Sequence, residues 1–273
     1  MQKRILLISA FLVLLIYIAC QTKIKDEYTI DMSKPVWQDE FDKDGLPDAQ
    51  KWGYDIGGNG WGNNEKQFYT KDTKNARVEN GNLIIEVHKE KHNNNDYTSA
   101  RLTSKGKGDF LYGRFEIKAK LPKGRGTWPA AWMLATEQTY GTKYWPDNGE
   151  IDIIEHVGYD QNRVHGNVHT KAFNHVIGTN KGNNILVEGV SDGFHVYACE
   201  WLPDKISIEI DGNKYFTFNR IEGWEQWPYD KKFHLLLNVA IGGNWGGQKG
   251  IDDTIFPLRM EVDYVRIFQA VKK

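Results

Sequence analysis

The residues of this sequence best suited to chemistry are three acids, Glu150, Asp152 and Glu155, in the segment G-E-I-D-I-I-E-H-V-G. The residues between them are isoleucines, whose β-branched side chains favour an extended strand. Side chains alternate between the two faces of a strand, so Glu150 and Asp152 point one way and Glu155 would point the other. A β-bulge near Ile153 or Ile154 would return Glu155 to the first face. The sequence therefore predicts a bulged strand with three carboxylates on one surface.

Two carboxylates on one face suit the hydrolysis of a glycosidic bond. A separation of roughly 5–5.5 Å gives retention of configuration through a covalent intermediate, and a wider gap gives inversion. Glu150 and Glu155, joined across a bulge, fit the shorter spacing. The competing interpretation is an acidic but solvated strand face. Against it, stacked like charges without Lys or Arg between them repel, and a site that needs unequal carboxylate pKa values is a reason to keep them.

The segment resembles the active-site strand of glycoside hydrolase family 16, in the bulged E-x-D-x-x-E form associated with laminarinases and agarases. The resemblance implies that Glu150 is the nucleophile, Glu155 the general acid/base and Asp152 the residue that tunes the pair. It implies a retaining, endo-acting hydrolase of β-1,3-glucan, with mixed-linkage β-1,3-1,4-glucan as a further substrate and no cofactor for catalysis. Three alternatives stay open, namely a hydrolase of another polysaccharide such as a galactan, a transglycosylase, and a non-catalytic glycan-binding surface protein.

The composition agrees with a protein that acts on a neutral polymer. The chain has 273 residues, enough for one large β domain or two small ones, and 13% of them are aromatic, including 10 Trp. Aromatic rings offer flat apolar faces that suit the C–H faces of sugars as well as a protein core. Without residues 1–19, 33 of the 35 basic residues remain against 36 acidic ones, a net charge of −3. No basic surplus points to nucleic acid, and we expect a monomer.

The N-terminal segment has the pattern of an export signal. Lys3 and Arg4 precede the almost wholly apolar residues 5–19, which are too few to span a membrane. The following Y-I-A-C resembles a bacterial lipoprotein cleavage box, with Cys20 as the lipidated first residue, although Tyr17 replaces the usual leucine. We expect a lipid-anchored protein of the cell envelope, periplasmic or at the cell surface, or a secreted one if Cys20 is not lipidated. The predicted division is a lipoprotein signal peptide at 1–19, a polar tether at 20–35 and a catalytic domain at 36–270.

Short alternating segments separated by turn signals predict an all-β fold. Residues 109–122 alternate between apolar and charged side chains, and residues 194–218 have the pattern of a meander with turns at P-D-K and D-G-N. These patterns indicate a two-sheet antiparallel sandwich. The resemblance covers about residues 36–270 and narrows the fold to a β-jelly roll with a substrate cleft on its concave sheet. Residues 171–193 are predicted to be a loop, and Cys199 suits a buried position without a disulfide.

Aromatic and polar residues around the acidic strand are candidates for sugar binding. Trp128 and Trp132 are four apart in a predicted strand, so they share a face and offer two stacking platforms. The resemblance adds the loop G-W-G-N-N-E, which ends at the further candidate Glu65, and residues of other segments. The predicted substrate-binding set is Trp61, Asn63, Asn64, Arg101, Trp128, Trp132, Trp145, His169 and Trp245. In the resemblance, Arg101 serves the minus subsites and His169 lies beside the acid/base.

Two metal sites can be considered from the sequence. His165 and His169 are four residues apart, a spacing that binds zinc on a helix. The stretch has strand character and lacks an H-E-x-x-H pattern, so zinc is not predicted. The resemblance implies a structural calcium ion away from the cleft, held by Glu40, Gly81 and Asp263 partly through backbone oxygens.

Overall fold

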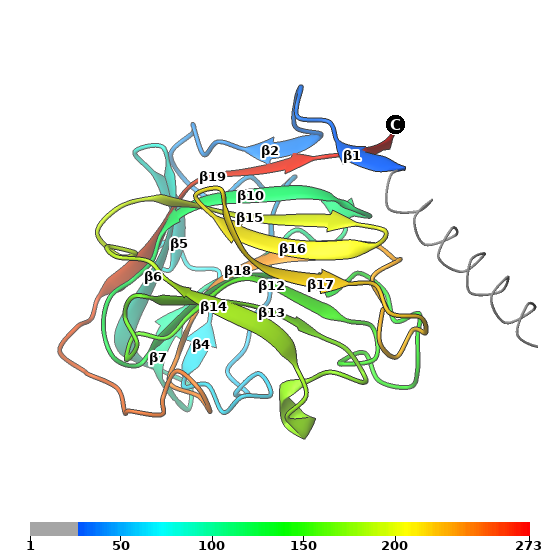
Figure 1. Cartoon of the computed structure of the whole chain (residues 1–273). Coiled ribbons are helices and arrows are strands. Elements are labelled where there is room, and N and C mark those ends of the chain that lie inside the picture. Colours follow the sequence, from blue (N-terminus) through cyan, green and yellow to red (C-terminus); the bar gives the residue numbers. More distant parts are fainter. Residues whose placement is uncertain (1–26) are drawn as a thin grey trace, which may run out of the picture.

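The alternating segments form two stacked β-sheets in the computed structural model, which describes residues 27–273 (Figure 1). The predicted signal peptide and Cys20 lie outside the described residues. The larger sheet has the strand order β17 (Asn213–Asn219), β16 (Lys205–Ile210), β15 (His195–Leu202), β10 (Gly113–Lys120), β19 (Leu258–Phe268), β6 (Asn82–His92), β7 (Asn95–Ser99) and β4 (Gln67–Tyr69), with β2 (Trp37–Asp39) beside β19 and β5 (Ala76–Glu79) beside β6. The smaller sheet has the order β14 (Lys181–Leu186), β13 (Arg163–His169), β12 (Glu150–His156), β11 (Thr127–Ala135), β18 (Phe233–Ile241), β8 (Arg101–Thr103) and β3 (Gly53–Tyr54), with β9 (Asp109–Phe110) beside β18.

Strand pairing in the described chain is antiparallel with one exception. β4 runs parallel to β7 at the end of the larger sheet. The predicted all-β, two-sheet sandwich is confirmed, and the parallel pair is a departure from it. The sequence could not reveal this pair, because β4 emerges from a glycine-rich loop and its partner is set by where that loop returns.

The core lies between the two sheets, where inward side chains of facing strands interdigitate. β10 alternates as the sequence predicts, with Phe115 and Ile117 fully buried and Arg114 and Glu116 half-buried. Each fully buried side chain of this size contributes about 1.5–3 kcal/mol to stability. All nine residues of β18 are buried, because one of its faces packs in the core and the other forms part of the floor of the cleft described below.

Two segments fold where the sequence predicts no element. β1 (Tyr28–Ile30) lies inside the predicted tether 20–35 and pairs with β20 (Ala270–Lys272) beside the C-terminus (Figure 1). The predicted domain bounds of 36 and 270 were therefore too narrow, because a three-residue strand is too short to show alternation. The predicted loop 171–193 contains a 3₁₀ turn, η1 (His175–Ile177), and β14. β14 is a mostly exposed edge strand, so its sequence carries no apolar period.

Cys199 is a buried free thiol on β15, as the sequence predicts. Burial raises the pKa of this thiol, so it stays protonated and unreactive. None of the described residues belongs to a helix long and apolar enough to cross a membrane.

Candidate active site

The bulge predicted in the acidic strand is present in β12, which lies between β13 and β11 in the smaller sheet. Asp152 pairs with Asn167 of β13, and Glu155 pairs with His165. Two residues of β12 therefore lie opposite a single residue of β13, and the extra residue returns Glu155 to the face of Asp152. Both carboxylates and Glu150 line one cleft, which confirms the predicted surface with three carboxylates.

The residues behind the bulge fix its position. β11 pairs Ala131 with Ile154 and leaves Ile153 without a partner, so Ile153 is the inserted residue. Both isoleucines are fully buried. Gly166 lies opposite the bulge, and a Cβ at this position would come 2.8 Å from the hydroxyl oxygen of Tyr215. Glycine therefore allows β13 to approach the larger sheet closely at this point.

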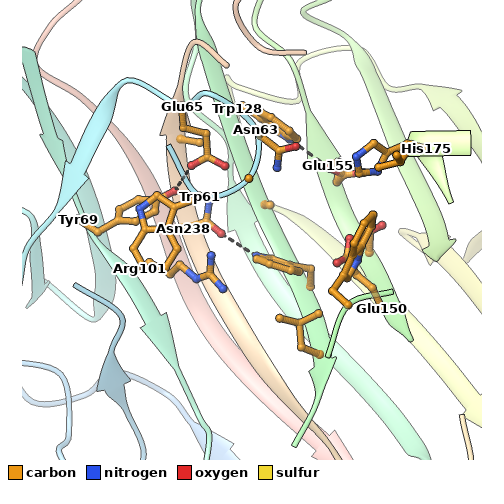
Figure 2. A pocket seen from close by; sticks show the side chains of 18 of the residues that line it. Trp61, Asn63, Glu65, Tyr69, Arg101, Trp128, Glu150, Glu155, His175 and Asn238 are labelled. Atoms are coloured by element: carbon orange, nitrogen blue, oxygen red, sulfur yellow. Dashed lines mark hydrogen bonds between the residues drawn. The ribbon is translucent and has the colours of Figure 1, made fainter. Parts of the chain in front are cut away.

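A groove crosses the smaller sheet and widens on both sides of the carboxylates. One cavity has a volume of about 360 Å³ and the next has a volume of about 390 Å³. Glu150 and Glu155 line both cavities, together with Asn63, Trp128 and His175 (Figure 2). The two cavities are thus parts of one groove, with the carboxylate pair at their junction.

Glu155 is held by hydrogen bonds at both of its carboxylate oxygens. Trp128 Nε1 donates to Oε1 at 3.2 Å, and Asn167 Nδ2 donates to Oε2 at 2.9 Å. Donors of this kind fix the direction of the side chain and favour its charged form. Trp128, predicted as a stacking platform, therefore also positions Glu155.

His169 lies against the other two carboxylates. Its Nε2 is 3.3 Å from Asp152 Oδ2 and 3.8 Å from Glu150 Oε1. The register of β12 and β13 pairs His169 with Glu150, and His169 lines the second cavity together with Glu155, beside which the resemblance placed it. His169 is nearly fully buried.

All three carboxyl groups of the cleft have raised pKa values, and burial is the largest cause for each. Repulsion adds to burial, since Asp152 raises the pKa of Glu150 and Glu155 raises that of Asp152. The His169 ring and the two hydrogen-bond donors act in the opposite direction on Glu155. The cluster therefore retains a proton to higher pH than an isolated carboxyl group would.

We expect Asp152→Asn to move the acidic limb of the pH profile of kcat/KM to lower pH. The limb reports the ionisation of Glu150, whose pKa is raised by burial and then by the charge of Asp152. Removal of that charge lowers the pKa of Glu150, so the nucleophile ionises at lower pH. The maximal kcat/KM should fall roughly 10²-fold, because the nucleophile loses its orienting partner. An unchanged acidic limb in steady-state kinetics from pH 4 to 9 would contradict this interpretation.

Arg101 lies between two of the predicted tryptophans. Its guanidinium carbon is 4.7 Å from the ring centroid of Trp61 and 4.7 Å from that of Trp132. Its Nε is 3.0 Å from Asp55 Oδ2. A guanidinium over an indole face is attracted by the ring quadrupole. Three residues predicted as separate sugar contacts therefore form one stack in the wall of the first cavity.

Trp132 is also fixed at its edge by a chain of hydrogen bonds. Its Nε1 donates to Asn238 Oδ1 at 2.7 Å, and Asn238 Nδ2 donates to the Tyr69 hydroxyl at 3.0 Å. That hydroxyl donates to Glu65 Oε2 at 3.3 Å. Burial raises the pKa of Glu65, which lines the same cavity. The floor of the first cavity is thus a connected polar network set before any sugar binds.

The remaining predicted sugar-binding residues divide between the two cavities. Trp145 lines the first cavity, Trp245 lines the second, and Asn63 lines both. Asn64 lines neither of them, although the sequence placed it in the substrate-binding set. Its exposed side chain donates instead to Asn244 Oδ1 at 2.8 Å and joins two loops.

Sequence reasoning missed about half of the groove. The missed residues include Tyr69, Tyr144, His175, Val176 and Asn238 in the first cavity and His165, Asn167, Asn180, Asn244 and Gln248 in the second. Asn238 carries a signal, since it is the single amide in the apolar run F-H-L-L-L-N-V-A-I. His175 and Val176 carry none, because they lie in a polar segment without periodicity.

One group of potential metal ligands in residues 27–273 lies in the groove itself. Ligand atoms of Glu150, Asp152 and His169 are within 4.8 Å of one another. These three residues are also the ones that contact one another in the carboxylate cluster. The group differs from the zinc pair considered from the sequence, which was His165 with His169.

The residues assigned to calcium meet at a bulge in β19. β19 changes its partner strand from β6 to β2 around Asp263, close to Glu40 at the end of β2 and to Gly81 just before β6. The two carboxylates are paired with cations, Glu40 with Arg266 at 2.7 Å and Asp263 with Lys118 at 2.6 Å. A structural calcium ion held by Glu40, Gly81 and Asp263 stays a prediction.

A jelly-roll sheet with a groove, buried paired carboxylates and tryptophan walls defines a glycoside hydrolase. Residues 63–266 match the family model Glycosyl hydrolases family 16. The chain therefore belongs to glycoside hydrolase family 16 and is an enzyme of that class. The family and the fold class predicted from the sequence are confirmed.

The chain is similar to known β-glucanases in sequence and in structure. It is 54% identical over 244 residues to a β-glucanase of Rhodothermus marinus, and the aligned region covers 87% of this chain and 85% of that protein. Its structure matches that of the laminarinase of Rhodothermus marinus with a TM-score of 0.86 and 53% identity, over 87% of this chain and 98% of the other. A non-specific endo-β-1,3(4)-glucanase of family 16, crystallised with an oligosaccharide, matches with a TM-score of 0.84 and 44% identity over 89% of this chain and 98% of the other.

Proposed function

We propose that this glycoside hydrolase is an endo-acting β-1,3-glucanase of the laminarinase type that also cuts mixed-linkage β-1,3-1,4-glucan. The observation that carries the proposal is the groove on both sides of Glu150 and Glu155, because a polymer can lie across it with sugars bound on either side of the scissile bond. The names of the relatives support a β-glucan as the substrate. Arg101 is the single Lys or Arg among the lining residues of the two cavities, which disfavours a sulfated galactan.

The mechanism follows from the two glutamates and their partners. Glu150 attacks the anomeric carbon while Glu155 gives its proton to the leaving glycosidic oxygen, which forms a covalent glycosyl-enzyme. Glu155 is then a carboxylate, the form that Trp128 and Asn167 stabilise through its two oxygens. It takes a proton from a water molecule that attacks the same carbon and releases Glu150. Two displacements at one carbon give net retention.

Asp152 orients the nucleophile Glu150 and raises its pKa in this mechanism. Its Oδ2 lies 3.3 Å from His169 Nε2, and its negative charge raises the pKa of Glu150. It is 2% exposed, so its charge acts on Glu150 through a medium of low dielectric constant. Asp152 therefore orients Glu150 and sets the pH range in which the cluster holds its proton.

The test is reducing-end release by the purified protein from laminarin, mixed-linkage glucan and agarose. We expect the fastest release from laminarin. Release from agarose alone would contradict the substrate and keep the mechanism. Binding to all three without release would favour the glycan-binding alternative, and products longer than an added oligosaccharide substrate would favour the transglycosylase.

We also propose that the protein is exported and anchored through Cys20, and that it acts as a monomer. The charged start, the apolar residues 5–19 and the sequence Y-I-A-C support the anchor. Cys20→Ser should move the enzyme from the membrane fraction to the soluble fraction and abolish incorporation of labelled palmitate. Light scattering of the purified protein tests the monomer.

We propose that calcium binds at the β19 bulge and stabilises the fold. Chelation by EDTA is expected to lower Tm, and added Ca²⁺ to restore it, because the ion holds β2 and the turn before β6 against β19. kcat at 25 °C should not change, since the bulge lies outside the groove. Differential scanning calorimetry measures the shift, and Asp263→Asn should remove it. A Tm that is independent of EDTA in the parent protein would contradict the proposal.

A further inference from the structure

The segment between β13 and β14, residues 171–180, forms one rim of the groove at the carboxylate pair, and we call it the rim segment. It contains η1 and projects from the lower edge of the molecule in Figure 1. His175 lines both cavities, Val176 lines the first and Asn180 lines the second. Figure 2 shows His175 and Glu155 among the residues that line the first cavity. The rim segment therefore follows the groove across the point of cleavage.

The rim segment is built around Asn174, which is buried. Its Nδ2 donates to the carbonyl oxygens of Thr170 at 3.1 Å and Lys171 at 3.2 Å. Its Oδ1 accepts a hydrogen bond from the backbone N–H of Ile177 at 3.3 Å, and the backbone N–H of Asn174 donates to Thr179 Oγ1 at 3.2 Å. One side chain thus satisfies the backbone on both sides of η1. These bonds define a fixed position for the residues at the tip.

His175 packs the rim segment against Trp145 and against His169 of the catalytic cluster. Its ring centroid is 5.2 Å from that of Trp145 and 5.2 Å from that of His169. Burial, with a smaller effect of His169, lowers the pKa of His175. A neutral imidazole has one donor and one acceptor nitrogen, so it suits a sugar hydroxyl, which also offers both.

Val176 and Ile177 are neighbours at the tip that differ in one respect. Val176 is 69% exposed and Ile177 is 58% exposed, so both present apolar surface to water. Val176 lines the first cavity and Ile177 lines neither cavity. A sugar in the groove would cover the Val176 side chain and remove apolar area from water, which is favourable. The same sugar would leave Ile177 exposed.

We propose that His175 and Val176 are substrate-contacting residues that bind the sugars at the scissile bond. His175 hydrogen-bonds the glucosyl units that flank the bond, and Val176 packs on a C–H face of the unit in the first cavity. The ligand is a neutral β-linked glucan chain, so the inference rests on the proposed β-glucanase function. The rim segment adds binding energy beside the reacting carbon without taking part in the proton transfers.

The test compares Val176→Ala with Ile177→Ala on linear β-1,3-gluco-oligosaccharides. We expect Val176→Ala to raise KM roughly threefold to tenfold, because two methyl groups of sugar contact are lost, with kcat unchanged within about twofold. Ile177→Ala is the matched control, with the same kind of truncation on the same segment and an unchanged KM. Both variants should keep the parent Tm, since both side chains are exposed.

Equal KM values for the two variants, with an active parent enzyme, would overturn the inference and leave the β-glucanase proposal intact. A parent enzyme that is inactive on β-1,3-glucan and active on mixed-linkage glucan would overturn the substrate proposal instead. The same pair of variants, measured on that second substrate, would then decide the role of Val176. His175→Ala should raise KM in the same direction, and an unchanged KM would overturn the role of His175.

Discussion

Glu150→Ala is expected to lower kcat roughly 10⁴-fold or more, while the affinity for oligosaccharides stays within about tenfold of the parent value. The reason is that Glu150 forms the covalent bond, whereas the stack of Trp61, Arg101 and Trp132 and the polar floor bind the sugar without it. Steady-state kinetics and isothermal titration calorimetry measure the two quantities. Loss of binding together with loss of turnover would instead indicate a structural role for Glu150.

Azide distinguishes the nucleophile from the acid/base. In Glu150→Ala, azide can occupy the vacated space and attack the anomeric carbon once, which gives a glycosyl azide of inverted configuration. In Glu155→Ala, the covalent intermediate still forms from a substrate with a good leaving group, and azide then gives the retained configuration. NMR of the products reads the configuration directly. The opposite pairing of variant and product would exchange the roles assigned to Glu150 and Glu155.

Deleting Ile151 is expected to abolish activity, whereas deleting Ile153, two positions away, is expected to preserve it. Ile153 is the inserted residue of the bulge, so its removal leaves β12 in continuous register with β11 and β13. The sequence then reads E-I-D-I-E, and strict alternation puts all three acids on one face. Removal of Ile151 makes Glu150 and Asp152 adjacent, so they face opposite ways.

The two deletions form a matched pair, because each removes one buried isoleucine from the same strand. Removal of Ile153 should cost about 2–4 kcal/mol of stability through the lost side chain, and removal of Ile151 should cost more, because it also turns a carboxylate towards the core; urea unfolding at 25 °C measures both. Reducing-end release is the readout that separates them. If the variant without Ile153 folds and has no activity, or the variant without Ile151 keeps it, the register assigned to β12 is wrong.

The acidic strand could be predicted from the sequence because its information is local. Three acids, three β-branched residues and a spacing of five fix the strand, the bulge and the shared face without reference to any other segment. The same holds for Trp128 and Trp132, whose spacing of four places them on one face of β11, where both line the groove.

The partners of these residues depend on contacts distant in sequence. The register of β12 with β13 brings His169 to Glu150, and the pairing of β11 with β18 brings Asn238 to Trp132. No local pattern specifies which residue of one strand faces which residue of another. A local motif can also mislead. The loop motif predicted that Asn64 binds sugar, but its side chain hydrogen-bonds Asn244 of a neighbouring loop.

The continuation of the groove past Glu150 and Glu155 has a consequence for the bulk properties of the substrate. An enzyme whose binding site continues on both sides of the scissile bond can engage a glucan at its internal linkages, and the number of such linkages grows with chain length. Long molecules are therefore cleaved internally before short ones are shortened from their ends. The viscosity of a glucan solution should collapse while few new chain ends have formed, and the mean molar mass should fall far ahead of the yield of glucose.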